Sequence, residues 1–192
     1  DLTAGFGQDA LLLAINGASH VHMVERNPIV GALLQDAMRR LELISLSTSS
    51  SLVEEKESEC SEINESRRQQ QAAILLTKLS LTIGEGKEIM QKQHHQCCDV
   101  IYLDPMFPRR QKQAAVKKGM QILHGLLETQ SKNSIPEEKE KEERDLLSSA
   151  LEAAKLRVVV KRPVNAPPIM STAKPSYTIT GSINRWDVYV SN

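Results

Sequence analysis

The chain has 192 residues, of which 40% are hydrophobic and 25% are charged. This composition is ordinary for a globular protein and excludes collagen-like, wholly disordered and disulfide-scaffold classes. The length predicts a single domain over residues 1–192. Because 24 basic residues balance 24 acidic ones, the net charge itself gives no sign of nucleic-acid binding.

The cysteine content and the hydropathy indicate in which compartment the protein works and whether it binds a membrane. Three cysteines are too few for a disulfide framework and favour a reducing compartment such as the cytoplasm. No apolar run approaches the roughly 18 residues of a membrane span, so we expect no membrane partner. The opening Asp1-Leu2-Thr3-Ala4-Gly5 resembles the end of a strand entering a turn, which suggests N-terminal truncation.

Apolar periodicity predicts strands and helices that alternate along most of the chain. Short apolar or alternating runs predict strands at 21–24, 78–83, 100–103, 157–161, 176–180 and 185–191. Helical spacing predicts helices at 10–15, 29–43, 111–128 and 146–155. Serine-rich and glutamate-rich sequence at 45–72, and mixed charges at 131–144, predict two polar, flexible insertions, although a charged helix is the alternative for the first.

This order of elements predicts an α/β fold, a doubly wound and mostly parallel sheet that ends in an antiparallel C-terminal hairpin. In such a sheet, ligands bind beyond the carboxyl ends of the strands. Loops with unusual composition follow the inferred strands, at 3–9, 25–26, 84–86, 104–110 and 161–163. We therefore expect these loops to lie at one edge of the sheet.

The first loop, Gly5-Phe6-Gly7-Gln8-Asp9-Ala10, fits the loose G-x-G-x-x-G/A pattern. Glycines there allow a sharp turn and a close approach to a ligand. Glu25 lies 20 residues further on, at a strand end, where a carboxylate can accept hydrogen bonds from ribose hydroxyls. The pattern favours a nucleotide-like ligand over a plain helix-capping turn, but does not separate a dinucleotide from S-adenosylmethionine.

Asp104-Pro105-Met106-Phe107-Pro108 favours methyl transfer to an exocyclic base amine. Such a nitrogen is a poor nucleophile because its lone pair is delocalised into the ring. Asp104 and the carbonyl of Pro105 can accept the two amine hydrogens, and Phe107 can stack on the base and hold it in line. The alternative is a strand-terminating turn with a core phenylalanine.

At these residues the sequence resembles the RsmJ family, guanine-N2 methyltransferases of small-subunit ribosomal RNA. The similarity spans nearly the whole chain outside the two insertions and is carried by residues 1–9, 24–28, 102–108, 116–118, 158–163 and 166–168. Met106 departs from the Asp/Asn-Pro-Pro-aromatic motif of the wider superfamily and agrees with the form in this family. A Rossmann-like class-I fold that uses S-adenosyl-L-methionine is what the resemblance implies.

The resemblance also implies site residues and partners. Cofactor contacts are implied at Gly5, Gly7, Gln8, Asp9, Glu25, Arg26, Glu85, Gly86 and Asp104. Gln8 stands where the family usually has arginine, and Glu85 where it has a small hydroxyl residue, so both positions depart from the family pattern. The implied partner is small-subunit ribosomal RNA or the small ribosomal subunit, in the cytoplasm or, for a eukaryotic member, in a plastid or mitochondrion.

Basic residues follow the catalytic loop closely and predict a surface that grips RNA phosphates. They are Arg109, Arg110, Lys112, Lys117 and Lys118, with Lys161 and Arg162 from the next strand. A solvated helix face is the alternative. We expect no metal, because the adjacent ligands of His94-His95-Gln96-Cys97-Cys98 rarely suit tetrahedral zinc.

Other functions remain open from the residues alone. Asp-Pro-x-aromatic chemistry would serve adenine N6 or a protein glutamine equally well. A non-catalytic RNA-binding or assembly module and a dinucleotide-dependent oxidoreductase are the alternatives from other classes.

Overall fold

The computed structural model describes residues 1–47, 59–92, 97–105, 136–169, 171 and 173–191. These residues form two compact units, Asp1–Glu85 and Gly86–Asn192, which are described separately. Helices alternate with strands, parallel pairs form in both units and the chain ends in an antiparallel hairpin, which confirms the predicted α/β class. Within the described residues, no helix is both long and apolar enough to cross a membrane. That the chain is a single domain stays a prediction.

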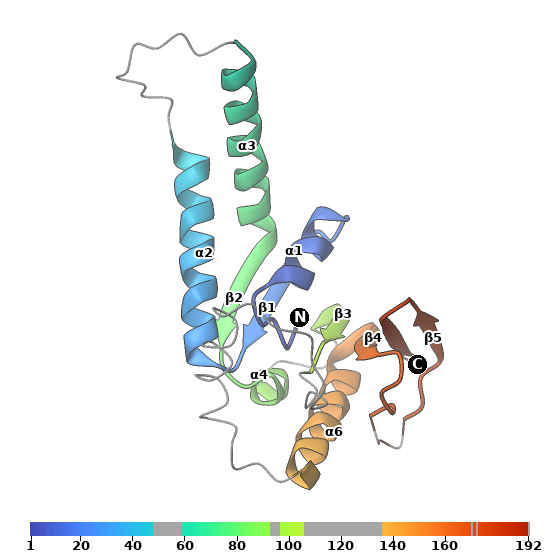
Figure 1. Ribbon diagram of the computed structural model, residues 1–192. Helices are drawn as coiled ribbons and strands as arrows, with labels where there is room; N and C mark the ends of the chain where they lie inside the picture. Colours follow the sequence, from blue (N-terminus) through green and yellow to red (C-terminus); the bar gives the residue numbers. More distant parts are fainter. Residues whose placement is uncertain (48–58, 93–96, 106–135, 170, 172, 192) are drawn as a thin grey trace, which may run out of the picture. The chain divides into compact units, whose positions relative to one another are not determined.

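The first unit has a two-stranded parallel sheet covered by helices (Figure 1). Its elements are α1 (Gln8–Ile15), β1 (Val21–Glu25), α2 (Pro28–Leu46), α3 (Glu59–Lys78) and β2 (Leu79–Ile83). The strand register runs from Val21 opposite Leu79 to Glu25 opposite Ile83, so both strands end at the same level. The loops that follow them therefore start side by side.

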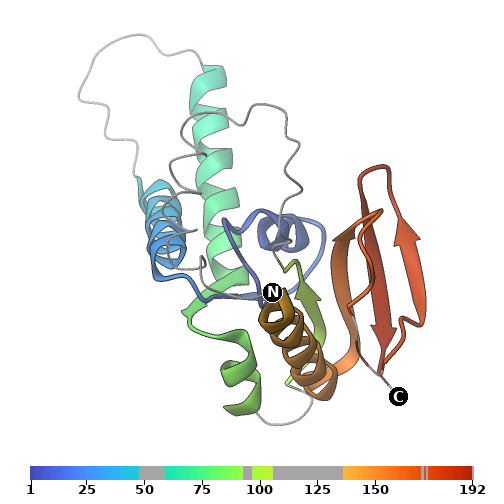
Figure 2. The ribbon, with the colours of Figure 1, turned by 60° about the horizontal axis from the view of Figure 1, so that its bottom comes forward.

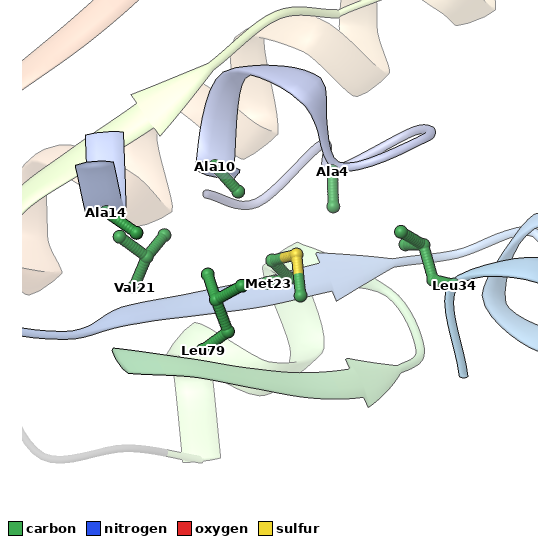
Figure 3. Close-up of a cluster of buried hydrophobic side chains, with 7 residues drawn as sticks. All are labelled: Ala4, Ala10, Ala14, Val21, Met23, Leu34 and Leu79. Carbon is green, nitrogen blue, oxygen red and sulfur yellow. The ribbon is translucent and has the colours of Figure 1, made fainter. Parts of the chain in front are cut away.

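Small side chains bring α1 close to this sheet. Ala10 and Ala14 lie one turn apart on the helix, are fully buried, and face Val21 and Met23 on β1 (Figure 3). Because alanine adds little bulk, the helix backbone can approach the strands closely. This contact fixes the start of α1, and with it the glycine-containing loop that precedes the helix.

The predicted flexible insertion at 45–72 is wrong for residues 59–72, which belong to α3. Glutamate, glutamine, arginine and alanine are good helix formers, so a polar run rich in them is compatible with a helix as well as with disorder. The apolar end of the run supplies the tertiary contacts: Ala72 is buried and Leu75 packs against the core of the unit. α3 also lies alongside α2 in both views (Figures 1 and 2).

The second unit has a four-stranded sheet in the order β3-β4-β6-β5. Its elements are α4 (Gly86–Lys92), β3 (Cys98–Leu103), α6 (Pro136–Ala153), β4 (Ala154–Pro163), β5 (Tyr177–Thr180) and β6 (Asn184–Val190). β3 and β4 are parallel, whereas β6 runs antiparallel to β4 and β5 (Figure 2). The predicted C-terminal hairpin is therefore confirmed.

The second predicted insertion is also partly wrong, because residues 136–144 form the first half of α6. Proline is well tolerated in a first helical turn, and Glu137 and Glu138 favour the positive end of the helix dipole. Leu147 and Ala150 then bury one face of the helix. The helix α4 was not predicted, and the predicted helix at 111–128 lies outside the described residues.

His22 on β1 gives the first unit a predicted dependence on pH. Its ring nitrogens contact the hydroxyls of Ser80 and Thr82, at 2.7 and 3.0 Å. Burial is the largest cause that lowers the pKa of His22 below its ordinary value of 6.5, and the electrostatic effect of His20 adds to it. The unfolded chain then binds a proton more readily than the folded chain does. The contribution of His22 to the free energy of unfolding is therefore fully present above about pH 6.5, and it is lost as the pH falls through the lower pKa of the folded state.

We expect the free energy of unfolding in urea to fall between about pH 7.5 and about pH 5.5, and to fall less in the His22→Gln variant. His20→Gln removes only one of the charges that lower the pKa of His22 and should reduce the fall by less than His22→Gln does. An unchanged pH dependence in His22→Gln would show that other groups carry the effect.

Candidate cofactor and catalytic site

The loop that enters α1 is a tight turn built on two glycines with positive φ. Gly5 has φ +53° and Gly7 has φ +72°, a left-handed conformation that favours glycine. The amide of Gly7 donates to the carbonyl of Ala4 at 2.7 Å, which closes the turn. The amide of Ala4 donates to the carbonyl of Val24 on β1, so the start of the loop is tied to the sheet.

Glu25, at the end of β1, joins three of the predicted loops. One carboxylate oxygen accepts the Gly5 amide at 2.8 Å, and the other accepts the Asn27 amide at 2.7 Å. Its own backbone carbonyl accepts the amide of Gly84, just past β2. Glu25 is only 8% exposed. The prediction that Glu25 ends a strand is confirmed, whereas its contact with a cofactor stays a prediction. The sequence did not show that Glu25 also holds the glycine loop in place.

The two glycines of this loop have different surroundings. A Cβ atom at Gly7 would lie 2.9 Å from Cδ2 of Leu34, in the packed core. Among the described residues beyond its chain neighbours, a Cβ atom at Gly5 would meet only the Thr3 carbonyl oxygen, at 3.9 Å. Gly7 therefore serves packing, whereas the space beside Gly5 would let a ligand approach the backbone next to the Glu25 carboxylate.

Gly7→Ala is expected to lower the free energy of unfolding by about 2–4 kcal/mol, because backbone strain adds to the clash with Leu34. Gly5→Ala has the strain without the clash and is expected to cost about 1 kcal/mol. Urea unfolding of both variants measures the difference. Equal losses would contradict the assignment of distinct roles.

The other predicted cofactor residues lie around this loop or in the second unit. Gln8 and Asp9 form the first turn of α1, with Gln8 exposed and Asp9 half-buried. Arg26 is exposed directly after Glu25, and Glu85 is exposed after β2. Gly86 is buried at the start of α4.

The predicted catalytic carboxylate follows β3 in the second unit. Leu103, the last residue of β3, lies opposite Val160 of the parallel strand β4. Asp104 comes next, and its Oδ2 lies 3.0 Å from Nζ of Lys161. The Asp104 side chain is 40% exposed, while Pro105 is buried. Asp104 is therefore held at a strand end with part of its side chain exposed.

Arg162 does not form part of an exposed basic surface, contrary to the prediction. It is 2% exposed, and its guanidinium pairs with Glu143 of α6 at 3.0 Å. A second nitrogen donates to the carbonyl of Pro167 at 2.6 Å. Burial lowers the pKa of this guanidinium, and the Glu143 pair opposes that shift. The side chain ties α6 to the loop after β4.

Sequence reasoning missed Arg185 of β6, which organises the same loop. Its guanidinium donates to the carbonyls of Val164 and Ala166, at 2.9 and 2.5 Å. Two further nitrogens pair with both oxygens of the buried Asp187, at 2.9 and 3.1 Å. Because β3 and β4 are parallel, this loop begins at the same sheet edge as Asp104. In the sequence, the only sign of Arg185 and Asp187 is the alternation of charged and apolar residues in the predicted last strand, 185–191.

Several predicted residues lie outside the described residues: Phe107, Arg109, Arg110, Lys112, Lys117, Lys118, His94 and His95.

The adjacent cysteines Cys97 and Cys98 do not supply a reactive thiolate at Cys98. Burial, and then Cys97, raise the pKa of the Cys98 thiol to about 12, which keeps it protonated at neutral pH. The described part of the chain holds no group of three or more His, Cys, Asp or Glu suited to a metal ion.

Together, the fold and these loops define a Rossmann-like, class-I methyltransferase fold. A solved SAM-dependent methyltransferase of Neisseria gonorrhoeae matches with a TM-score of 0.60 and 30% identity, over 98% of this chain and 63% of that one. An rRNA methyltransferase of Streptomyces viridochromogenes matches with a TM-score of 0.52 and 11% identity, over 97% and 73%, which supports the fold alone.

The family follows from the sequence comparison. The model of a family described as "Putative SAM-dependent methyltransferase" matches residues 1–54 and 60–191. The chain belongs to this family.

Two curated relatives show which kind of methyltransferase the chain resembles. A protein of Hahella chejuensis is 38% identical over 189 residues, and one of Pseudoalteromonas atlantica is 37% identical over 196 residues. Both are named ribosomal RNA small subunit methyltransferase J. The matches cover 98% and 100% of this chain but 56% and 62% of the relatives, so the chain spans little more than half of their length.

Proposed function

We propose that this protein transfers a methyl group from S-adenosylmethionine to the exocyclic N2 amine of a guanine in small-subunit ribosomal RNA. The observation that carries the proposal is the position of Glu25, whose buried carboxylate holds the Gly5 loop beside space that no described residue beyond the chain neighbours of Gly5 fills. The names of the curated relatives support the RNA substrate.

The residues of the first unit fit the cofactor. A carboxylate has about four acceptor sites, so Glu25 can hold the Gly5 and Asn27 amides and still accept ribose hydroxyls. Gly5 is left-handed and has no side chain of its own to keep a ligand from its backbone. Gln8, Asp9, Arg26, Glu85 and Gly86 are the further candidates for contacts. When bound, S-adenosylmethionine supplies an electrophilic methyl group on a sulfonium.

Asp104 supplies the chemistry on the substrate side. Its carboxylate accepts an N–H of the guanine amine, which localises the nitrogen lone pair and stabilises the positive charge that develops there. The Pro105 carbonyl accepts the second hydrogen, and Phe107 stacks on the base. The proton that the amine loses passes to water or to an adjacent acceptor.

The RNA surface remains a proposal based on Arg109, Arg110, Lys112, Lys117 and Lys118. Arg162 is left out because it is buried and paired with Glu143. A basic surface of this kind would bind RNA phosphates and present the target base to Asp104. We place the reaction in the cytoplasm, a reducing compartment that agrees with the free thiols of Cys97 and Cys98.

Three measurements test the class of protein. Isothermal titration should show binding of S-adenosylmethionine, and added NADH should show no fluorescence enhancement. Tritium from labelled S-adenosylmethionine should then enter the RNA of small ribosomal subunits from a bacterium whose own relative of this enzyme is deleted. Cofactor binding without transfer would favour an assembly module, and an NADH signal would favour an oxidoreductase.

A further inference from the structure

The ion pair between Asp104 and Lys161 joins the ends of β3 and β4. We infer that Lys161 is a positioning residue that holds the Asp104 carboxylate for methyl transfer, rather than a contact to RNA phosphate. This inference rests on the proposed function and assigns Lys161 a different role within it. The Nζ–Oδ2 distance is 3.0 Å, and the Lys161 side chain is 20% exposed.

The backbone around Lys161 makes it a rigid support. β4 is paired on both sides: Val160, the residue before Lys161, lies opposite Leu103 of β3, and Lys161 itself lies opposite Trp186 of β6. A site residue carried by a strand inside a sheet is held more precisely than one carried by a loop. Asp104 is the first residue past β3, so the ammonium fixes it where strand pairing ends.

A second lysine–aspartate pair on the same two strands provides a comparison. Lys155 of β4 and Asp99 of β3 lie 3.6 Å apart, with side chains 48% and 73% exposed. That pair is longer and more open to water, as is typical of surface ion pairs that contribute little. The Asp104–Lys161 pair is shorter and better shielded, and thus better suited to restrain a carboxylate.

The electrostatics favour positioning over RNA binding. An ammonium keeps its carboxylate partner anionic, the form that accepts an amine hydrogen, and uses one of about four acceptor sites. A lysine whose charge is already neutralised by a carboxylate neutralises little phosphate charge, and so releases few of the counterions condensed on the RNA. Lys161 should therefore contribute to turnover and not to the salt-dependent part of RNA affinity.

The test compares turnover and RNA binding in Lys161→Met, Lys161→Arg and the matched control Lys155→Met. For Lys161→Met, we expect kcat with saturating small ribosomal subunits to fall about 10- to 100-fold, since a small misplacement of a reacting group has effects of this size. Its Kd for the RNA should stay within about twofold and the slope of log Kd against log salt should not change. Lys161→Arg should recover part of kcat, and Lys155→Met should leave it intact.

Thermal unfolding and S-adenosylmethionine titration establish that each variant is folded, and Lys161→Gln serves as a second neutral variant if Lys161→Met is unstable. Unchanged kcat in the neutral variants would overturn the inference. So would weaker RNA binding with a salt slope reduced by about one, which is the signature of a lost phosphate contact. Absence of methyl transfer by the wild-type protein would instead contradict the proposed function on which the inference rests.

Discussion

Asp104→Ala is expected to lower kcat for methyl transfer by at least about 10²–10³-fold, the loss typical of removing one preorganised hydrogen-bonding group. The amine would lose the acceptor that localises its lone pair. The fold should persist, because the side chain is 40% exposed and its pair with Lys161 is partly open to solvent. We expect a stability change of at most about 1 kcal/mol.

A single-turnover assay with tritiated S-adenosylmethionine measures the effect on the chemical step. Asp99→Ala is the matched control, since Asp99 lies on the same strand and also pairs with a lysine of β4. Methyl transfer by Asp104→Ala at the wild-type rate would remove Asp104 from the mechanism.

Glu25→Gln should have the second large effect, this time on cofactor binding. The substitution keeps the shape of the side chain but replaces one acceptor oxygen by an NH₂ group, which would face the amide of Gly5 or Asn27. A buried donor without an acceptor costs about 1–3 kcal/mol. We expect a loss of stability of that order and a rise of at least about tenfold in the Kd for S-adenosylmethionine.

Isothermal titration and urea unfolding measure the two effects separately. Glu42→Gln, an exposed carboxylate on α2, should change neither quantity. If Glu25→Gln were destabilised but bound S-adenosylmethionine with wild-type affinity, Glu25 would be a structural support for the loop and not a cofactor contact.

The sequence predicted best where a single pattern decides the structure. The apolar runs at 21–24 and 100–103 became β1 and β3, because a buried strand needs an apolar run that ends at a turn signal. Glu25 and Asp104 could be found for the same reason: each is the first carboxylate at or after a strand end.

Polar segments and side-chain partners were harder to predict. The polar part of α3 has the composition of a disordered segment, and the helix is favoured by the packing of Ala72 and Leu75 further along. Basic residues near a site suggest RNA, but Arg162 satisfies its charge with Glu143, 19 residues away, and Lys161 with Asp104 on the neighbouring strand. Such pairs depend on strand register and helix packing, which local sequence patterns do not contain.

Nucleoside mass spectrometry tests the central claim most directly. Small ribosomal subunits from a bacterium that lacks its own relative of the enzyme would be incubated with the protein and labelled S-adenosylmethionine, and their RNA digested to nucleosides. The account predicts that the label appears in N2-methylguanosine and that Asp104→Ala abolishes it. Label in N6-methyladenosine or in ribosomal protein, or no label in the RNA, would contradict it.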